Sequence, residues 1–295
     1  MSEIFGVPTQ ALFGQLLIGL INGSFYALLS LGLAVIFGLL NIINFTHGAQ
    51  YMMGAFCAYL LLNKLGVGYW WALVIAPVLV GITGVVIERT MLKPLYKLDH
   101  LYGLLLTFGL ALIIQGVFRN EYGSSGQPYP IPGELTGGHN LGFMFLPTYR
   151  AWVIVASLAV CLGTWFVIER TRLGAYLRAA TENPQLVQAF GINVPRMITL
   201  TYGFGVGLAA LAGVMAAPIY QVSPQMGSSL IIVVFAVVVI GGMGSIMGSI
   251  VTGFGLGVIE GLTKVFYPEA SNTVIFIIMA IVLMFKPAGL FGKEK

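Results

Sequence analysis

The run "ALFGQLLIGLINGSFYALLSLGLAVIFGLL", residues 11–40, decides the fold class, because it contains no charged side chain over its whole length. About 20 apolar residues are enough for a helix to cross a bilayer, so this run is longer than one simple span. The triplet Asn22-Gly23-Ser24 interrupts it. Two interpretations stay open: one long tilted helix with the N-terminus outside, or a span joined to a short or broken helix with the N-terminus inside.

The composition extends this interpretation to all 295 residues. Apolar residues make up 58% of the chain and charged residues 8%, against roughly 25% charged residues in a soluble domain. The mean hydropathy is +0.94. Ten acidic and fourteen basic residues are too few to cover a soluble core of this size. The net charge of +4 does not indicate nucleic-acid binding, because the basic residues lie at the ends of apolar runs.

The fold class that follows is all-α. We expect a polytopic membrane helix bundle of about eight to ten transmembrane helices, some of them broken, in a single transmembrane domain over residues 1–295. The N-terminus has no basic start and no small-residue cleavage site, so the first span is expected to stay attached. The further apolar runs of suitable length are 46–63, 69–88, 101–118, 150–168, 197–217, 229–246, 248–266 and 273–286.

The distribution of lysine and arginine orients these spans, because both residues concentrate in cytoplasmic loops. Ten of the fourteen lie in segments 88–100 and 169–196 and in the tail from Lys286 onward. Segment 169–196 is therefore a predicted cytoplasmic loop and 119–149 a predicted periplasmic loop. Dense glycine and proline in 119–149 predict a structured loop or hairpin, either a connector or a surface for a partner. The four remaining bases fall on the periplasmic side: Lys64, Arg119, Arg150 and Lys264.

Enzyme motifs are missing from the sequence. It has no HExxH, GxSxG or GxxxxGK[ST] motif and no cluster of cysteine and histidine. We therefore expect no catalytic residue, no metal site and no cofactor, and any ATP that drives the protein has to be hydrolysed by a partner. Cys57 and Cys161 lie in apolar runs, where packing as small hydrophobic residues is the expected role.

Acidic residues inside spans are the usual coupling groups of ion-driven transporters. Glu88, Asp99 and Glu169 lie beside basic residues at predicted span ends, where long side chains are expected to reach water. Only Glu260 lies within a predicted span, and Lys264 four residues later is its expected partner. One interior acid is therefore a weak case for a transporter coupled to protons.

Two segments of the chain, 35–61 and 237–262, share a design. Each has an apolar run, a patch broken by glycine or asparagine, and then a helix with glycine and methionine. Paired interrupted segments mark the substrate path of many transporters, although this glycine spacing also serves close helix packing. His47 also fits a purely structural hydrogen bond. The candidate pathway residues are polar and neutral or small: Asn22, Tyr26, Asn41, Asn44, His47, Gln50, Gln115, Gly241 and Gly244.

The stretch "RLGAYLRAATENPQLVQAFGINVPR", residues 172–196, is the charged part of the predicted cytoplasmic loop. Apolar residues at helical spacing from 173 to 180 predict a first helix. The pair Asn183-Pro184 is a start signal for a second helix, and Gly191 with Pro195 is a stop signal. A helix of two turns is not stable alone in water. It needs a surface, which is the membrane interface, its own bundle or a cytosolic partner.

These residues carry a resemblance to a known family. The segment "RTRLGAYLRAATENPQLVQAFGINVPR" (170–196) resembles the cytoplasmic coupling loop of ABC importer permeases. The segments "NIINFTHGAQYMMGAF" (41–56), "VVVIGGMGSIMGSIVTG" (237–253) and "FKPAGLFG" (285–292) resemble the LivH-type permeases of branched-chain amino acid uptake systems. Ala-Thr-Glu stands in the loop where a strict signature of such permeases reads Glu-Ala-Ala.

The resemblance implies a set of partners and a coupling site. The partners are a LivM-type second permease, two cytosolic ABC ATPase subunits, a periplasmic solute-binding protein and an amino acid substrate, in a bacterial inner membrane. A related permease for urea, short amides or other amino acids stays open as an alternative, and an intramembrane enzyme is a third class. The residues implied to couple to the ATPase are Arg178, Ala179, Ala180, Glu182, Asn183, Pro184 and Gly191.

Overall fold

The protein is an all-α polytopic membrane bundle. The computed structural model describes residues 3–4, 6–40, 43–142 and 144–292. In the described residues, six helical segments are long and apolar enough to cross a membrane. They are formed by helices α1 (Thr9–Leu40), α3 (Tyr69–Ile87) with its continuation to Leu95, α4 (His100–Tyr122), α5 (Thr148–Arg170), α8 (Val194–Ala216) and α10 (Ile246–Phe266).

Three further helices pack among these six: α2 (Thr46–Leu65), α9 (Ser228–Gly241) and α11 (Val274–Phe285). Helix α2 carries polar residues at its start, and α9 and α11 are 14 and 12 residues long. They are therefore less apolar or shorter than the six spans. The expected total of eight to ten crossings stays a prediction.

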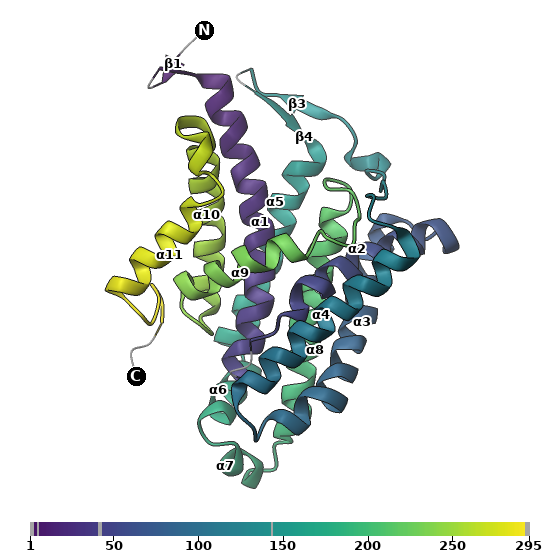
Figure 1. Cartoon of the computed structure of the whole chain (residues 1–295), viewed down its shortest axis with the longest axis vertical. Coiled ribbons are helices and arrows are strands. Elements are labelled where there is room, and N and C mark those ends of the chain that lie inside the picture. The colour runs from purple at the N-terminus through teal and green to yellow at the C-terminus, as the bar shows by residue number, and fades with distance from the viewer. Residues whose placement is uncertain (1–2, 5, 41–42, 143, 293–295) are drawn as a thin grey trace.

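Helix α1 is one continuous helix of 32 residues that runs along the length of the bundle (Figure 1). Of the two interpretations left open, one long helix is therefore confirmed, and a span joined to a short or broken helix is wrong. The Ser24 hydroxyl donates to the Leu20 carbonyl at 2.9 Å within the same helix. Gly23 is a packing residue rather than a break, because a Cβ there would lie 3.1 Å from the backbone of Gly253 and Phe254.

Helix α1 packs backbone to backbone against two later helices. A Cβ added to Gly257 of α10 would lie 2.4 Å from the Gly19 carbonyl oxygen of α1. A Cβ on Gly32 of α1 would lie 2.7 Å from the Gly205 carbonyl oxygen of α8. Small residues permit such approaches in membranes, where van der Waals contact drives helix association.

The two predicted breaks lie where the paired segments place them. Helix α1 ends at Leu40 and α2 begins at Thr46 with its first turns fully buried. Helix α9 ends at Gly241 and α10 begins at Ile246. In the second break Gly242 and Gly244 take positive φ angles of 98° and 85°, which side chains other than glycine rarely adopt.

The predicted periplasmic segment forms a hairpin, as its composition indicated. Strand β3 (Gly138–Asn140) pairs antiparallel with β4 (Phe145–Pro147), near the strand pair β1 (Glu3–Ile4) and β2 (Val7–Pro8) at the same end (Figure 1). A 3₁₀ turn precedes β3 at Gly133–Leu135, and a second one, Pro268–Ala270, follows α10. Gln127 and Val222 exchange two backbone hydrogen bonds of 2.8 and 2.9 Å, which tie this segment to the loop between α8 and α9.

The opposite end holds the predicted cytoplasmic elements. Helices α6 (Arg172–Glu182) and α7 (Pro184–Ala189) project there beyond the spans (Figure 1). Helix α3 continues there as a five-residue π-helix, Glu88–Leu92, and a 3₁₀ turn, Lys93–Leu95. The chain thus has distinct ends, one with hairpins and one with short amphipathic helices.

Candidate translocation and coupling sites

The short helix α7 has the start and stop that the sequence indicates. The Asn183 side chain accepts a hydrogen bond from the Leu186 backbone N–H at 3.0 Å, which makes Asn183 the N-cap, with Pro184 next. The chain leaves the helix through Gly191, whose φ is +82° and whose N–H donates to the Gln188 carbonyl at 2.9 Å. Helix, cap, short helix and stop are therefore confirmed as local structure.

One face of α7 is buried and another is not. Val187 is buried against Ala180 of α6 and Val194 of α8. Leu186 is 54% exposed and Phe190 is 77% exposed, although both are apolar. The structure buries only Val187 and leaves the other two uncovered.

The remaining residues of the predicted coupling set have different positions. The Arg178 guanidinium donates to the Ile168 carbonyl at 2.9 Å and to Glu169 at 3.3 Å, so it holds α6 to the end of α5. Ala180 is buried, with 6% of its surface exposed. Arg178 and the other five members of the set are exposed, namely Ala179, Glu182, Asn183, Pro184 and Gly191.

Replacing Asn183 with alanine tests the cap directly. Loss of an N-cap costs about 1 kcal/mol of helix stability. We expect faster amide hydrogen exchange across 184–190 in the Asn183→Ala variant. The control is Asn193→Ala, since Asn193 caps α8 through Arg196 N–H and should leave exchange in 184–190 unchanged. Equal exchange in Asn183→Ala and the unmodified chain would refute the capping role.

A cavity of about 500 Å³ with both polar and apolar lining residues lies between α1, α2, α9, α10 and the loop from α8 to α9, toward the end with the hairpins. Asn22 and Tyr26, two predicted pathway residues, line it. Tyr51, Tyr220 and Lys264 line it as well and were missing from the predicted set. No signal in the sequence joins Tyr220 to Asn22, because they are 198 positions apart.

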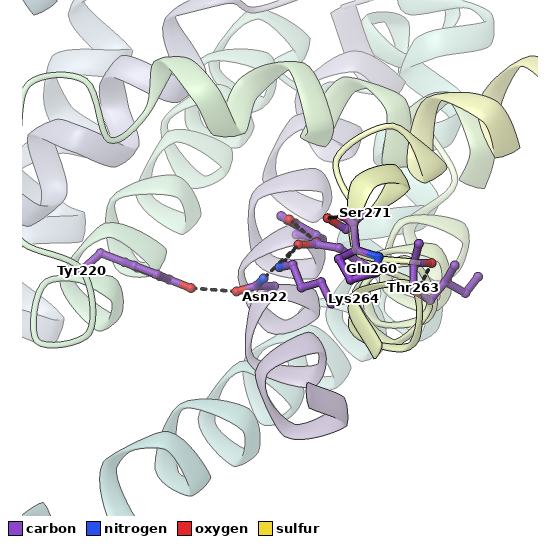
Figure 2. Close-up of polar contacts among 9 residues, drawn as sticks. Asn22, Tyr220, Glu260, Thr263, Lys264 and Ser271 are labelled. Carbon is purple, nitrogen blue, oxygen red and sulfur yellow. Dashed lines mark hydrogen bonds and ion pairs between the residues drawn. The ribbon is translucent and has the colours of Figure 1, made fainter. Parts of the chain in front are cut away.

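A hydrogen-bonded chain runs along the wall of this cavity. The Tyr220 hydroxyl donates to Asn22 Oδ1 at 2.7 Å, and Asn22 Nδ2 donates to Glu260 Oε1 at 3.3 Å. Figure 2 shows Tyr220 reaching across to Asn22, with Glu260 and Lys264 beyond it. The Tyr26 hydroxyl donates to the second oxygen of Glu260 at 2.7 Å, and Lys264 pairs with the first at 2.5 Å. The expected pairing of Glu260 with Lys264 is confirmed.

The second group of predicted pathway residues lies deeper in the bundle, at the start of α2. Asn44 Nδ2 donates to Gln50 Oε1 at 3.3 Å, and both side chains are fully buried. His47 Nε2 contacts the Leu29 carbonyl at 3.0 Å, while its Nδ1 has no hydrogen-bond partner among the described residues. Asn41 lies outside the described residues. This group is separate from the outer cavity.

The other three candidates lie in three further places. Gln115 lines a cavity of about 220 Å³ between α2, α4 and α9. Gly241 and Gly248 make the contact between α9 and α10, where a Cβ on Gly241 would lie 2.7 Å from the Gly248 backbone. Gly244 meets Gly38 of α1 near α6. The two glycine candidates therefore act in close packing, so the predicted pathway residues do not form one site.

Glu88 corrects an expectation. It was expected to reach water at a span end, but it is 1% exposed. The Tyr96 hydroxyl donates to its Oε1 at 2.6 Å and the Thr199 hydroxyl to its Oε2 at 2.7 Å. Burial and the bond to Glu88 raise the pKa of Tyr96 above its ordinary value, so the phenol keeps its proton and remains the donor. Glu88 thus fastens the end of α3 to the first turns of α8.

A polytopic bundle with buried polar groups, a cavity between its helices and a capped helix pair at one end has the architecture of a transport permease. The family described as "Branched-chain amino acid transport system / permease component" matches residues 15–283. The chain belongs to this family. It is a multi-pass protein of the bacterial inner membrane.

Individual relatives agree with this assignment. The chain is 30% identical to the high-affinity branched-chain amino acid transport system permease protein LivH of Escherichia coli K12, over 100% of this chain and 99% of the relative. It is 31% identical to BraD of Pseudomonas aeruginosa, over 95% of this chain and 96% of the relative. LivM of Escherichia coli K12 is 28% identical over 90% of this chain and 67% of the relative. No solved structure matches the chain significantly.

Proposed function

We propose that this chain is the LivH-type permease subunit of an ABC importer for branched-chain amino acids. The observation that carries this proposal is the full-length similarity to LivH and BraD, both named as permeases of high-affinity branched-chain amino acid transport. The whole chain, residues 1–295, acts as one transmembrane permease domain. Its substrate moves by alternating access, in which the path opens to one side of the membrane at a time.

The partners complete the transporter. A LivM-type permease is the second membrane subunit, and similarity of this chain to LivM supports a pair of related permeases. Two cytosolic ABC ATPase subunits supply the energy, since the sequence has no GxxxxGK[ST] motif of its own. A periplasmic solute-binding protein delivers the amino acid.

The coupling site is the α6–α7 pair. Two apolar side chains are exposed here, Leu186 on α7 and Phe190 directly after its last residue, and we expect a partner to bury them. The ATPase is the partner that the cytoplasmic location and the family favour. A pull on α7 reaches α8 through Val194 and α5 through the Arg178 bond to Ile168, so both spans move with it.

The path runs past two groups of polar residues. The outer one is the cavity with Asn22 and Tyr26, and the inner one is the buried group of Asn44, His47 and Gln50. The named side chains of both groups are neutral hydrogen-bonding groups, which suit a zwitterionic solute that has to pass without being held tightly. Specificity then resides mostly in the binding protein.

Reconstitution tests this function. The complete complex is reconstituted in proteoliposomes, with the binding protein on the periplasmic side of the permease and ATP on the side of the ATPase subunits. We expect transport of leucine, isoleucine or valine only when ATP and both ATPase subunits are present. The control omits the ATPase subunits and supplies a proton or sodium gradient. Uptake by the permease alone under an ion gradient would refute the proposal, and uptake of urea or short amides in place of amino acids would move it to the related substrate class.

A further inference from the structure

The outer cavity, the one lined by Asn22 and Tyr26, has one cationic side chain among its described lining residues, and this cation is more exposed than its acidic partner. Lys264 lines the cavity with its side chain 30% exposed, whereas the Glu260 side chain behind it is 7% exposed. The carboxylate of Glu260 accepts from three donors, on Lys264, Asn22 and Tyr26. Its hydrogen-bonding capacity is therefore largely used.

Lys264 retains free capacity. An ammonium group has three N–H donors, and among the described residues the one hydrogen bond from Lys264 goes to Glu260. Two donors remain, and they belong to a side chain that reaches the cavity. An anionic group that enters the cavity can accept from them without displacing Glu260.

The rest of the wall suits the other parts of an amino acid. Tyr220, 40% exposed, presents its aromatic ring to the cavity, and the buried rings of Phe25 and Tyr51 lie in the wall. Aromatic faces attract an ammonium group. Phe25 and Tyr220 stand edge to face with centroids 5.7 Å apart, so these rings hold each other in place. Ile18 and Leu230 supply apolar surface for an alkyl side chain.

We propose that Lys264 is the carboxylate-binding residue of an outer substrate subsite, in which Glu260 holds the lysine and the aromatic rings receive the α-ammonium group of a zwitterionic, apolar amino acid. The inference rests on the proposed importer function and names the substrate chemistry of its outer cavity. The carbonyl oxygen of a neutral amide or urea also accepts from an ammonium donor, but it lacks the negative charge of a carboxylate, so the same residues favour the amino acid over those solutes.

The test compares charge variants within the complete reconstituted transporter. Lys264→Gln removes the cation but leaves Glu260 without its ionic partner, which alone can disturb the fold. The double variant Glu260→Gln/Lys264→Gln keeps the wall neutral and hydrogen-bonding. Lys264→Arg keeps the cation. The matched control is Lys64→Gln, because Lys64 is an exposed lysine at the same predicted side of the membrane.

We expect the double variant to lose roughly 10-fold to 100-fold of maximal leucine uptake at saturating loaded binding protein, the effect of one charge-assisted hydrogen bond. Its amount in the membrane and its ATPase activity without binding protein are expected to stay unchanged. Lys264→Arg and Lys64→Gln are expected to keep uptake within about twofold of the unmodified complex.

The outcomes separate this subsite from the importer function. Full leucine uptake by the double variant, with ATP-driven uptake by the unmodified complex intact, overturns the subsite and leaves the function standing. An unmodified complex that transports no amino acid overturns both. Loss of uptake in the double variant together with loss of assembled complex shows a structural role, and this too overturns the subsite.

Discussion

Phe190→Asp is expected to abolish ATP-driven uptake while the chain remains folded in the membrane. Phe190 directly follows α7 and is 77% exposed, so aspartate there disturbs no packing within this chain. Burial of a phenylalanine against a partner contributes about 1.5–3 kcal/mol, and an unpaired carboxylate in the same place opposes docking by several kcal/mol more. We therefore expect at least a roughly 100-fold loss of uptake.

The measurements are amino acid uptake and the ATPase activity stimulated by loaded binding protein, both normalised to the amount of assembled complex. Leu65→Asp is the matched control, because Leu65 is 71% exposed at the opposite end of the bundle. It should transport normally. Gly191→Pro gives a second line of evidence, since proline fixes φ near −65° and cannot adopt the +82° of Gly191. Normal coupled transport in Phe190→Asp would contradict a coupling role for α7.

Gly257→Ala is expected to destabilise the whole bundle. Its added Cβ would lie 2.4 Å from the Gly19 carbonyl oxygen and from Gly23 Cα, and these neighbours are backbone atoms that cannot rotate away. Overpacking of a tight core costs typically 1–3 kcal/mol and sometimes more. We expect a clear fall in the temperature at which the detergent-solubilised chain aggregates, and less protein recovered from membranes.

Gly255→Ala provides a control on the same helix. Gly255 of α10 has no atom within 4 Å of an added Cβ, and both substitutions bring the same gain in helix propensity. The Gly255 variant is therefore expected to match or slightly exceed the unmodified chain in stability. Equal stability of the two variants would show that α1 and α10 do not approach as closely as described.

The parts of the fold that sequence predicts best are governed by neighbours in the chain. Asn183, Pro184 and Gly191 determine α7 within about ten positions, and their capping chemistry is the same in any protein. The class of fold follows from composition, because a chain with 8% charged residues has no means of covering a soluble surface.

The features that the sequence did not predict depend on residues far away in the chain. Gly23 reads equally as a helix break or as a packing site, and only the arrival of Gly253 from α10 decides for packing. Glu88 reads as a water-exposed span end until Tyr96 and Thr199 converge on it. The polar residues predicted to line one path lie in several separate places for the same reason. The spacing of residues predicts which side chains share one face of a helix, but it does not predict which other helix packs against that face.

The seam between α1 and α10 has a consequence for the synthesis of the protein. Asn22 and its partner Glu260 are 238 positions apart. At about 5–20 residues per second, a ribosome needs roughly 10–50 s to cover that distance. For most of this time the first helix lies in the bilayer with its glycine face uncovered and Asn22 without either partner, because Tyr220 also follows it by 198 positions. Until α10 enters the membrane, the insertion machinery or an earlier helix such as α2 has to cover that face.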